Sequence, residues 1–92
     1  MQNNNRARKG IFRAEQSGEP IMGLPLIEIL SNCRVLIENH RGVTSYSCCE
    51  ISVCTKMGEI CIQGNKLEIA NMTKYRIVIT GSIESIALVK WR

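Results

Sequence analysis

The sequence predicts an all-β protein, a small antiparallel β-sandwich or partly closed barrel of about seven short strands, preceded by a disordered basic N-terminal tail. From residue 35 to residue 81, apolar and polar residues alternate with the period of two that half-buried strands require. Turns that contain glycine separate these runs, and no segment has the 3.6-residue apolar period of a helix that would cover a sheet. The sheet faces must therefore cover one another.

Residues 1–20 differ in composition from the rest of the chain. From Glu15 onward, eight Lys and Arg residues balance eight Glu residues, so the formal net charge of +4 belongs to the first residues. This predicts a flexible basic tail over residues 1–20 and a single β domain over residues 21–92. A short amphipathic helix that lays Ile11 and Phe12 on a membrane surface is the alternative for the tail. The four cations before the first acid are Arg6, Arg8, Lys9 and Arg13.

The first strands follow Pro25, a residue that suits a strand start or a sheet edge. Alternating apolar residues predict strands over Leu26–Leu30 and Cys33–Glu38. Asn39–Gly42 then predicts a turn, because glycine accommodates positive φ at no steric cost. A more polar strand is expected over Val43–Ser47.

The centre of the chain predicts a meander of three strands. Met57-Gly58 is the expected two-residue loop between Glu50–Lys56 and Glu59–Gln63, because this register gathers the apolar residues of both strands on one face. Gly64-Asn65 is expected to form a second loop of the same kind. Gly81-Ser82 is expected to turn the chain into its last strand.

Two finer features follow from the same pattern. The two-residue loop sets Lys56 opposite Glu59 and Cys54 opposite Cys61 on the polar face. In the last strand the apolar spacing slips from two residues to three, which predicts a β-bulge near Glu84-Ser85.

The sequence offers little catalytic chemistry. An odd number of cysteines favours free thiols in a reducing compartment, with zinc binding or a Cys54–Cys61 disulfide as alternatives. His40 is the only histidine, and the chain contains no Asp to orient it as a general base. We expect its ring to hydrogen-bond locally or to contact a partner, and we expect no enzyme activity, no cofactor and no metal. The five cysteines are Cys33, Cys48, Cys49, Cys54 and Cys61.

Nucleic-acid binding is a competing function, and membrane insertion is not expected. The basic tail and a sequence pI near 9.0 are compatible with phosphate contacts. However, only Phe12, Tyr46, Tyr75 and Trp91 are available to stack on bases, and the predicted domain is close to neutral. The N-terminus lacks the apolar core of a signal peptide, and no apolar run approaches the ~20 residues of a membrane helix. We expect a soluble intracellular protein.

The ordered set of β segments resembles the YabP/YqfC family of sporulation proteins, and its YqfC branch in particular. The resemblance covers nearly the whole predicted domain and leaves out the tail. The matching segments are LPLIEI at 24–29, IENHRGV at 37–43, Tyr46, EISVCTKMGEICIQGNKLEI at 50–69 and ITGSIESIAL at 79–88.

The resemblance implies a biological setting. It implies an endospore-forming bacterium, expression in the mother cell, and a non-enzymatic assembly or adaptor role in spore maturation or coat formation. It also implies a membrane-associated sporulation protein as partner, with a cytoplasmic location that is peripheral at the forespore membrane. A homo-oligomer is the other expected assembly. The resemblance supplies no catalytic residues.

We predict that the IENHRG turn and the strand after it contact a partner. Binding by strand addition requires an open sheet edge, and the two candidate edges are the Pro25-led first strand and the polar strand Val43–Ser47. Electrostatic contacts are predicted for Arg6, Arg8, Lys9 and Arg13 of the tail. The alternative function is a small β-barrel nucleic-acid-binding protein that uses this tail. The predicted interaction residues are Glu38, Asn39, His40, Arg41, Gly42 and Tyr46.

Overall fold

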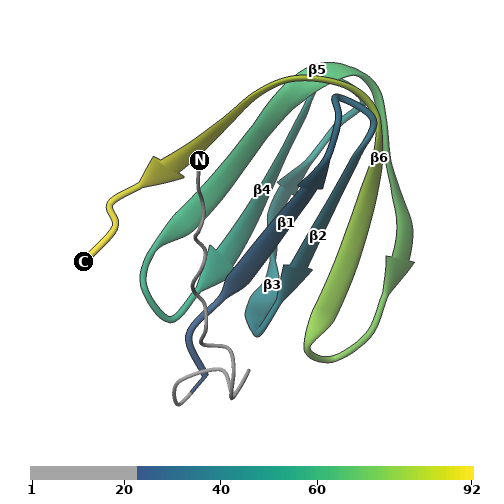
Figure 1. The fold of residues 1–92 in the computed structure, drawn as a ribbon. Helices are drawn as coiled ribbons and strands as arrows, with labels where there is room; N and C mark the ends of the chain where they lie inside the picture. The colour runs from purple at the N-terminus through teal and green to yellow at the C-terminus, as the bar shows by residue number, and fades with distance from the viewer. Residues whose placement is uncertain (1–22) are drawn as a thin grey trace, which may run out of the picture.

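The computed structural model describes residues 23–92, which form strands and no helix (Figure 1). The predicted all-β, antiparallel class is confirmed. Within residues 23–92 there is no helix of the length and hydropathy needed to cross a membrane. The predicted tail, with its four cations, lies outside the described residues. The strands are β1 (Leu26–Leu30), β2 (Arg34–Glu38), β3 (His40–Tyr46), β4 (Glu50–Thr55), β5 (Glu59–Met72) and β6 (Arg76–Val89).

A single antiparallel sheet, in the order β1-β2-β6-β5-β4-β3, folds over on itself. β5 and β6 are each 14 residues long and arch together over one end of the molecule (Figure 1). β2 pairs with the first half of β6 and carries β1 on its other side. β4 pairs with the first half of β5 and carries β3 on its other side. The two halves of this one sheet thus form the two layers of the sandwich, with strands that pass from one layer to the other.

The core lies between these two layers. Its residues occupy alternate positions along their strands, which is the period that the sequence predicts. Burying a Val, Leu or Ile side chain contributes about 1.5–3 kcal/mol relative to leaving it exposed, so this cluster is the main source of stability. The core residues, all 9% exposed or less, are Val35, Ile37, Ile51, Val53, Ile60, Ile62, Leu67, Ile77, Ile79 and Ile83.

The arch corrects two predicted turns. Gly64-Asn65 and Gly81-Ser82 are not loops, because both lie inside the continuous strands β5 and β6. The two dipeptides face each other across the arch, with Asn65 opposite Ser82. A Cβ on Gly64 would overlap the carbonyl oxygen of Ser82, and a Cβ on Gly81 would lie 2.6 Å from the carbonyl oxygen of Lys66. Glycine here permits two backbones to cross closely, and the prediction of a separate strand on each side is wrong.

The predicted bulge in the last strand is confirmed. Ser85 and Ile83 pair with consecutive residues of β5, which leaves Glu84 as the extra residue. The insertion returns the apolar side chains on both sides of it to the core: Ile83 is buried and Ile86 packs against the cluster. Leu88, farther along the strand, remains 53% exposed.

The hairpin between β4 and β5 turns one residue earlier than predicted. The N–H of Thr55 donates to the carbonyl of Gly58 at 2.8 Å, so the two loop residues are Lys56 and Met57. The Thr55 hydroxyl also accepts the N–H groups of Met57 and Gly58, at 3.1 and 3.2 Å. Gly58 is needed for a different reason, because a Cβ there would lie 2.7 Å from the carbonyl oxygen of Lys90.

Moving the loop by one residue shifts the pairing of the strands by two. Glu59 therefore lies opposite Cys54, and Cys61 lies opposite Ser52. The predicted opposition of Cys54 to Cys61 is wrong, as is that of Glu59 to Lys56, which lies in the loop itself. A shift of two residues keeps each side chain on its face of the sheet, so the apolar face is predicted correctly even though the partners are not.

Alanine substitutions at three glycines separate steric overlap from backbone strain. Gly64→Ala adds only overlap, and we expect it to lower the free energy of unfolding by about 1–3 kcal/mol. Gly81→Ala adds overlap to a φ of +136° and should lower it further. Gly42 has a φ of +125°, and no atom lies within 4 Å of a Cβ built there. Gly42→Ala therefore adds backbone strain alone and should lower the free energy of unfolding least. Urea denaturation measures all three, and equal losses would contradict a close crossing at the arch.

Candidate functional site

The two edge strands of the sheet, β1 and β3, differ in how open they are. The pairing of β3 with β4 is irregular twice, between His40 and Gly42 and between Val43 and Ser45. β1 instead pairs with β2 in unbroken register over five residues. Bulges hinder the addition of another strand, so, within residues 23–92, β1 is the edge that is better able to accept one.

β1 also exposes large apolar side chains on both of its faces. Leu26, Ile29 and Leu30 are 44%, 57% and 59% exposed. Ile29 lies on the same face as Ile27, which packs against the core, whereas Leu26 and Leu30 lie on the outer face. An edge strand with apolar residues on both faces is suited to being covered by another chain.

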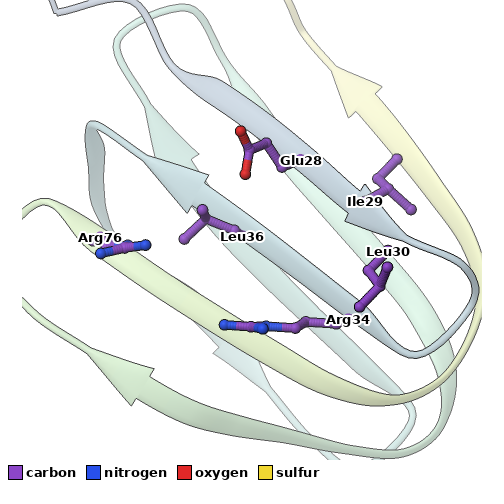
Figure 2. A pocket seen from close by; sticks show the side chains of 6 residues that line it. All are labelled: Glu28, Ile29, Leu30, Arg34, Leu36 and Arg76. Carbon is purple, nitrogen blue, oxygen red and sulfur yellow. The ribbon is translucent and has the colours of Figure 1, made fainter.

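A hollow of about 480 Å³ lies on the outer face beside β1 (Figure 2). Leu36 of β2 lies between Glu28 on one side and the guanidinium groups of Arg34 and Arg76 on the other. Leu36 is partly exposed, so apolar surface lies between these charged groups. The hollow thus joins apolar surface to charged groups of both signs. Its lining residues are Glu28, Ile29, Leu30, Arg34, Leu36 and Arg76.

The two arginines of this hollow differ in their pairing. The Nε of Arg76 lies 3.8 Å from Oε2 of Glu38, one of the predicted interaction residues. Both side chains are exposed, so this ion pair stabilises the fold by at most about 1 kcal/mol. Arg34 forms no ion pair with any residue between 23 and 92. A partner with an acidic group would find this guanidinium available.

Four predicted interaction residues, Asn39 to Gly42, form the corner where the chain passes from one layer to the other. Asn39 separates β2 from β3 and has a φ of +66°. Its side-chain amide donates to the carbonyl of Leu24 at 2.9 Å, and its backbone N–H donates to the carbonyl of Tyr75 at 2.6 Å. This residue therefore fixes both the start of β1 and the hairpin between β5 and β6.

His40 is a structural residue of this corner. Its ring is 4% exposed, with Nε2 3.0 Å from the carbonyl oxygen of Thr73 and Nδ1 accepting the N–H of Gly42 at 3.0 Å. A neutral imidazole with its proton on Nε2 satisfies both partners. Arg41 is the exposed side chain of the corner, and Tyr46, 58% exposed, lies at the far end of β3. Partner contacts by these residues stay a prediction.

Substitutions at neighbouring positions test the structural role of this corner. We expect His40→Ala to lower the free energy of unfolding by about 1–3 kcal/mol, because a buried ring is removed and the partly buried carbonyl of Thr73 and N–H of Gly42 lose their partner. Arg41→Ala, next to it and exposed, should change stability by less than about 0.5 kcal/mol. Thermal and urea denaturation measure both variants. Equal stability of His40→Ala and Arg41→Ala would show that the ring does not hold the corner.

The five cysteines in the structure are free thiols. Cys48 and Cys49 lie in the turn between β3 and β4 with their sulfur atoms 3.7 Å apart, and this hydrogen bond is the main reason that the pKa of Cys49 is raised. The Cys61 thiol donates to Oε2 of Glu50 at 3.0 Å, which is the largest cause of its raised pKa. Among residues 23–92, no three His, Cys, Asp or Glu side chains gather closely enough to hold a metal ion.

The Cys61–Glu50 contact predicts a pH-dependent reactivity. A raised pKa means less thiolate at a given pH, so Glu50→Gln should lower the pKa of Cys61 and speed its alkylation between pH 7 and pH 9. Glu68→Gln, which removes a carboxylate elsewhere, should leave the rate unchanged. Peptide-level mass spectrometry after iodoacetamide treatment measures the rates.

The same contact makes the stability of the fold depend on pH in a definite direction. The folded-state pKa of Cys61 is raised, so the contact stabilises the fold fully below the ordinary thiol pKa and loses its contribution as the pH rises through the raised value. An alkylation rate in Glu50→Gln equal to that of the parent protein would contradict this description of Cys61.

The model of the YabP family matches residues 25–91, which contain all six strands. The chain is also 30% identical, over 90 residues and 97% of each protein, to the uncharacterized protein YqfC of Bacillus subtilis strain 168. The chain belongs to the YabP family. No solved structure matches it. Membership of the YabP family points to a sporulation-related protein and confirms the resemblance found in the sequence.

Proposed function

We propose that this YabP family protein is a non-enzymatic assembly or adaptor factor for spore maturation or coat formation. In this proposal, edge strand β1 binds a membrane-associated sporulation protein in the mother cell, at the cytoplasmic side of the forespore membrane. Family membership supports the sporulation setting. The difference between the two sheet edges supports a binding role and selects β1.

The exposed side chains of β1 are the observation that carries the proposal. A partner strand that adds to this edge would satisfy its backbone groups and cover Leu26, Ile29 and Leu30. Since each of these side chains is now about half exposed, covering it contributes on the order of 1 kcal/mol. The hollow beside β1 would receive side chains on the outer face of the same partner strand.

Two other binding partners, a second copy of this chain and a nucleic acid, are less well supported. Antiparallel pairing of β1 with a second copy, centred on Glu28, sets two carboxylates directly opposite each other, which is unfavourable. Binding of a single-stranded nucleic acid requires a row of aromatic rings. Tyr46 is the last residue of β3, whereas Tyr75 lies beside His40, the first residue of β3, so the two rings do not form such a row.

Spore counts test this proposal in the source bacterium. We expect deletion of the gene to lower the number of heat-resistant spores by at least about tenfold. Replacing the gene with the Ile29→Lys variant should reproduce that loss, because a charge at an apolar docking position disfavours burial. Leu88→Lys is the matched control, since Leu88 is a similarly exposed apolar side chain on β6, 53% against 57%.

The possible results separate the two parts of the proposal. Normal spores after deletion would contradict the sporulation role. A loss on deletion without a loss in Ile29→Lys would leave the sporulation role and contradict binding through β1. Circular dichroism melting of both purified variants shows whether each retains the fold.

A further inference from the structure

Three connections meet at the end of the sandwich opposite the arch: the β2–β3 corner, the β4–β5 turn and the β5–β6 hairpin (the lower end of Figure 1). Two adjacent hollows lie between them and share His40, Arg41 and Tyr75 in their linings. The exposed or partly exposed residues around these hollows include three cations and two large apolar side chains. We call this set, Arg41, Lys56, Lys74, Met72 and Tyr75, the basic tip.

The apolar side chains of the basic tip project into solvent from a fixed backbone. Met72 is 49% exposed and Tyr75 is 59% exposed. The carbonyl of Tyr75 accepts the N–H groups of Asn39 and His40 at 2.6 and 3.3 Å, so the hairpin that presents the ring is held to the corner. Nζ of Lys74 lies 5.3 Å from the centroid of the Tyr75 ring, which places a cation beside an exposed aromatic surface.

The charge at this end of the molecule is positive. None of the described residues that line the two hollows is acidic, and Glu38, close by in the sequence, is paired with Arg76. The basic tip thus carries three cations, Arg41, Lys56 and Lys74.

We infer that the basic tip is a docking surface for an anionic lipid bilayer. Lys and Arg side chains are attracted to anionic headgroups, and the exposed Met72 and Tyr75 provide apolar surface that enters the interfacial region. Tyrosine is enriched at that depth because its ring is apolar and its hydroxyl is polar. A single aromatic ring at the tip does not provide the series of stacking surfaces that single-stranded nucleic acids require.

Docking by the basic tip would also orient β1. The first residue of β1, Leu26, pairs with Glu38, the residue that precedes the corner. β1 therefore starts at the basic tip and runs toward the arch (Figure 1). With the tip on the bilayer, the open edge would stand at an angle to the membrane and remain accessible. This inference does not depend on the proposed sporulation role.

Vesicle flotation with the full-length protein tests the inference. We expect binding to vesicles of phosphatidylcholine with one third phosphatidylglycerol, weaker binding as salt is raised, and no binding to phosphatidylcholine alone. Charge reversal in the double variant Arg41→Glu/Lys74→Glu should weaken binding by at least about tenfold. Met72→Ser/Tyr75→Ser, which keeps every charge, should weaken it by at least about threefold.

A matched control separates the tip from net charge. Lys66→Glu reverses one charge at a residue that lines neither of these hollows, and it should alter binding by less than about twofold, whereas Lys74→Glu alone should weaken binding by at least about threefold. Equal loss in the tip and control variants would overturn the inference, as would failure to bind the anionic vesicles. Tighter binding to a single-stranded oligonucleotide than to the vesicles, lost in Arg41→Glu/Lys74→Glu, would also overturn it by assigning the surface to nucleic acid. Melting curves show that each variant is folded.

Discussion

The close crossing of β5 and β6 at the arch is the constraint on which the rest of the structure depends. Both strands belong to both layers, so the sandwich exists only if the two backbones bend together at the same point. Gly64 and Gly81 make this bend sterically feasible. The turn between β3 and β4 is fastened to the same place, because the carbonyls of Cys48 and Cys49 accept the N–H groups of Leu67 and Gly64 at 2.8 and 3.0 Å. The arch therefore sets the spacing of the layers and closes one end of the core.

The corner around Asn39 and His40 closes the other end, and it sets the positions of the two proposed binding surfaces. Hydrogen bonds from this corner reach the segment before β1 and the hairpin between β5 and β6. The start of the open edge and the base of the basic tip are thus held by the same few residues. The IENHRG segment supplies this corner, so much of it is used to build the fold, and Arg41 is its outward-facing side chain.

The sequence was sufficient for features that depend on local pattern. The alternation of apolar residues identified Leu26–Leu30 as a strand and found the bulge at Glu84, because a change in spacing is visible along one strand. Features that depend on contacts between distant segments were beyond it. Gly64 has the same sequence signature in a turn and in a bend, and only its contact with Ser82 distinguishes them. The early turn at Lys56 depends on the hydroxyl of Thr55, a signal that was present in the sequence and was not used.

The candidate site was predictable to a similar extent. The residues LIEIL are apolar at both parities, which is typical of a strand with two apolar faces, although only the strand and its possible place at an edge were predicted. Whether such a strand lies in the middle or at the edge of a sheet is decided by topology, and here the order β1-β2-β6-β5-β4-β3 places it at an edge. His40 was correctly expected to hydrogen-bond locally. Its ring also contacts the carbonyl oxygen of Thr73, 33 residues away in the chain, and no local pattern contains that hydrogen bond.

The structure joins a two-layer scaffold to an edge strand, β1, that has no neighbour on one side among residues 23–92. The proposed contact between β1 and a protein partner is tested most directly by site-specific photo-cross-linking in sporulating cells. With a benzophenone amino acid in place of Ile29, we predict one discrete cross-linked product in the membrane fraction, absent when the same group replaces Leu88. No product from position 29, or the same product from both positions, would contradict binding through β1.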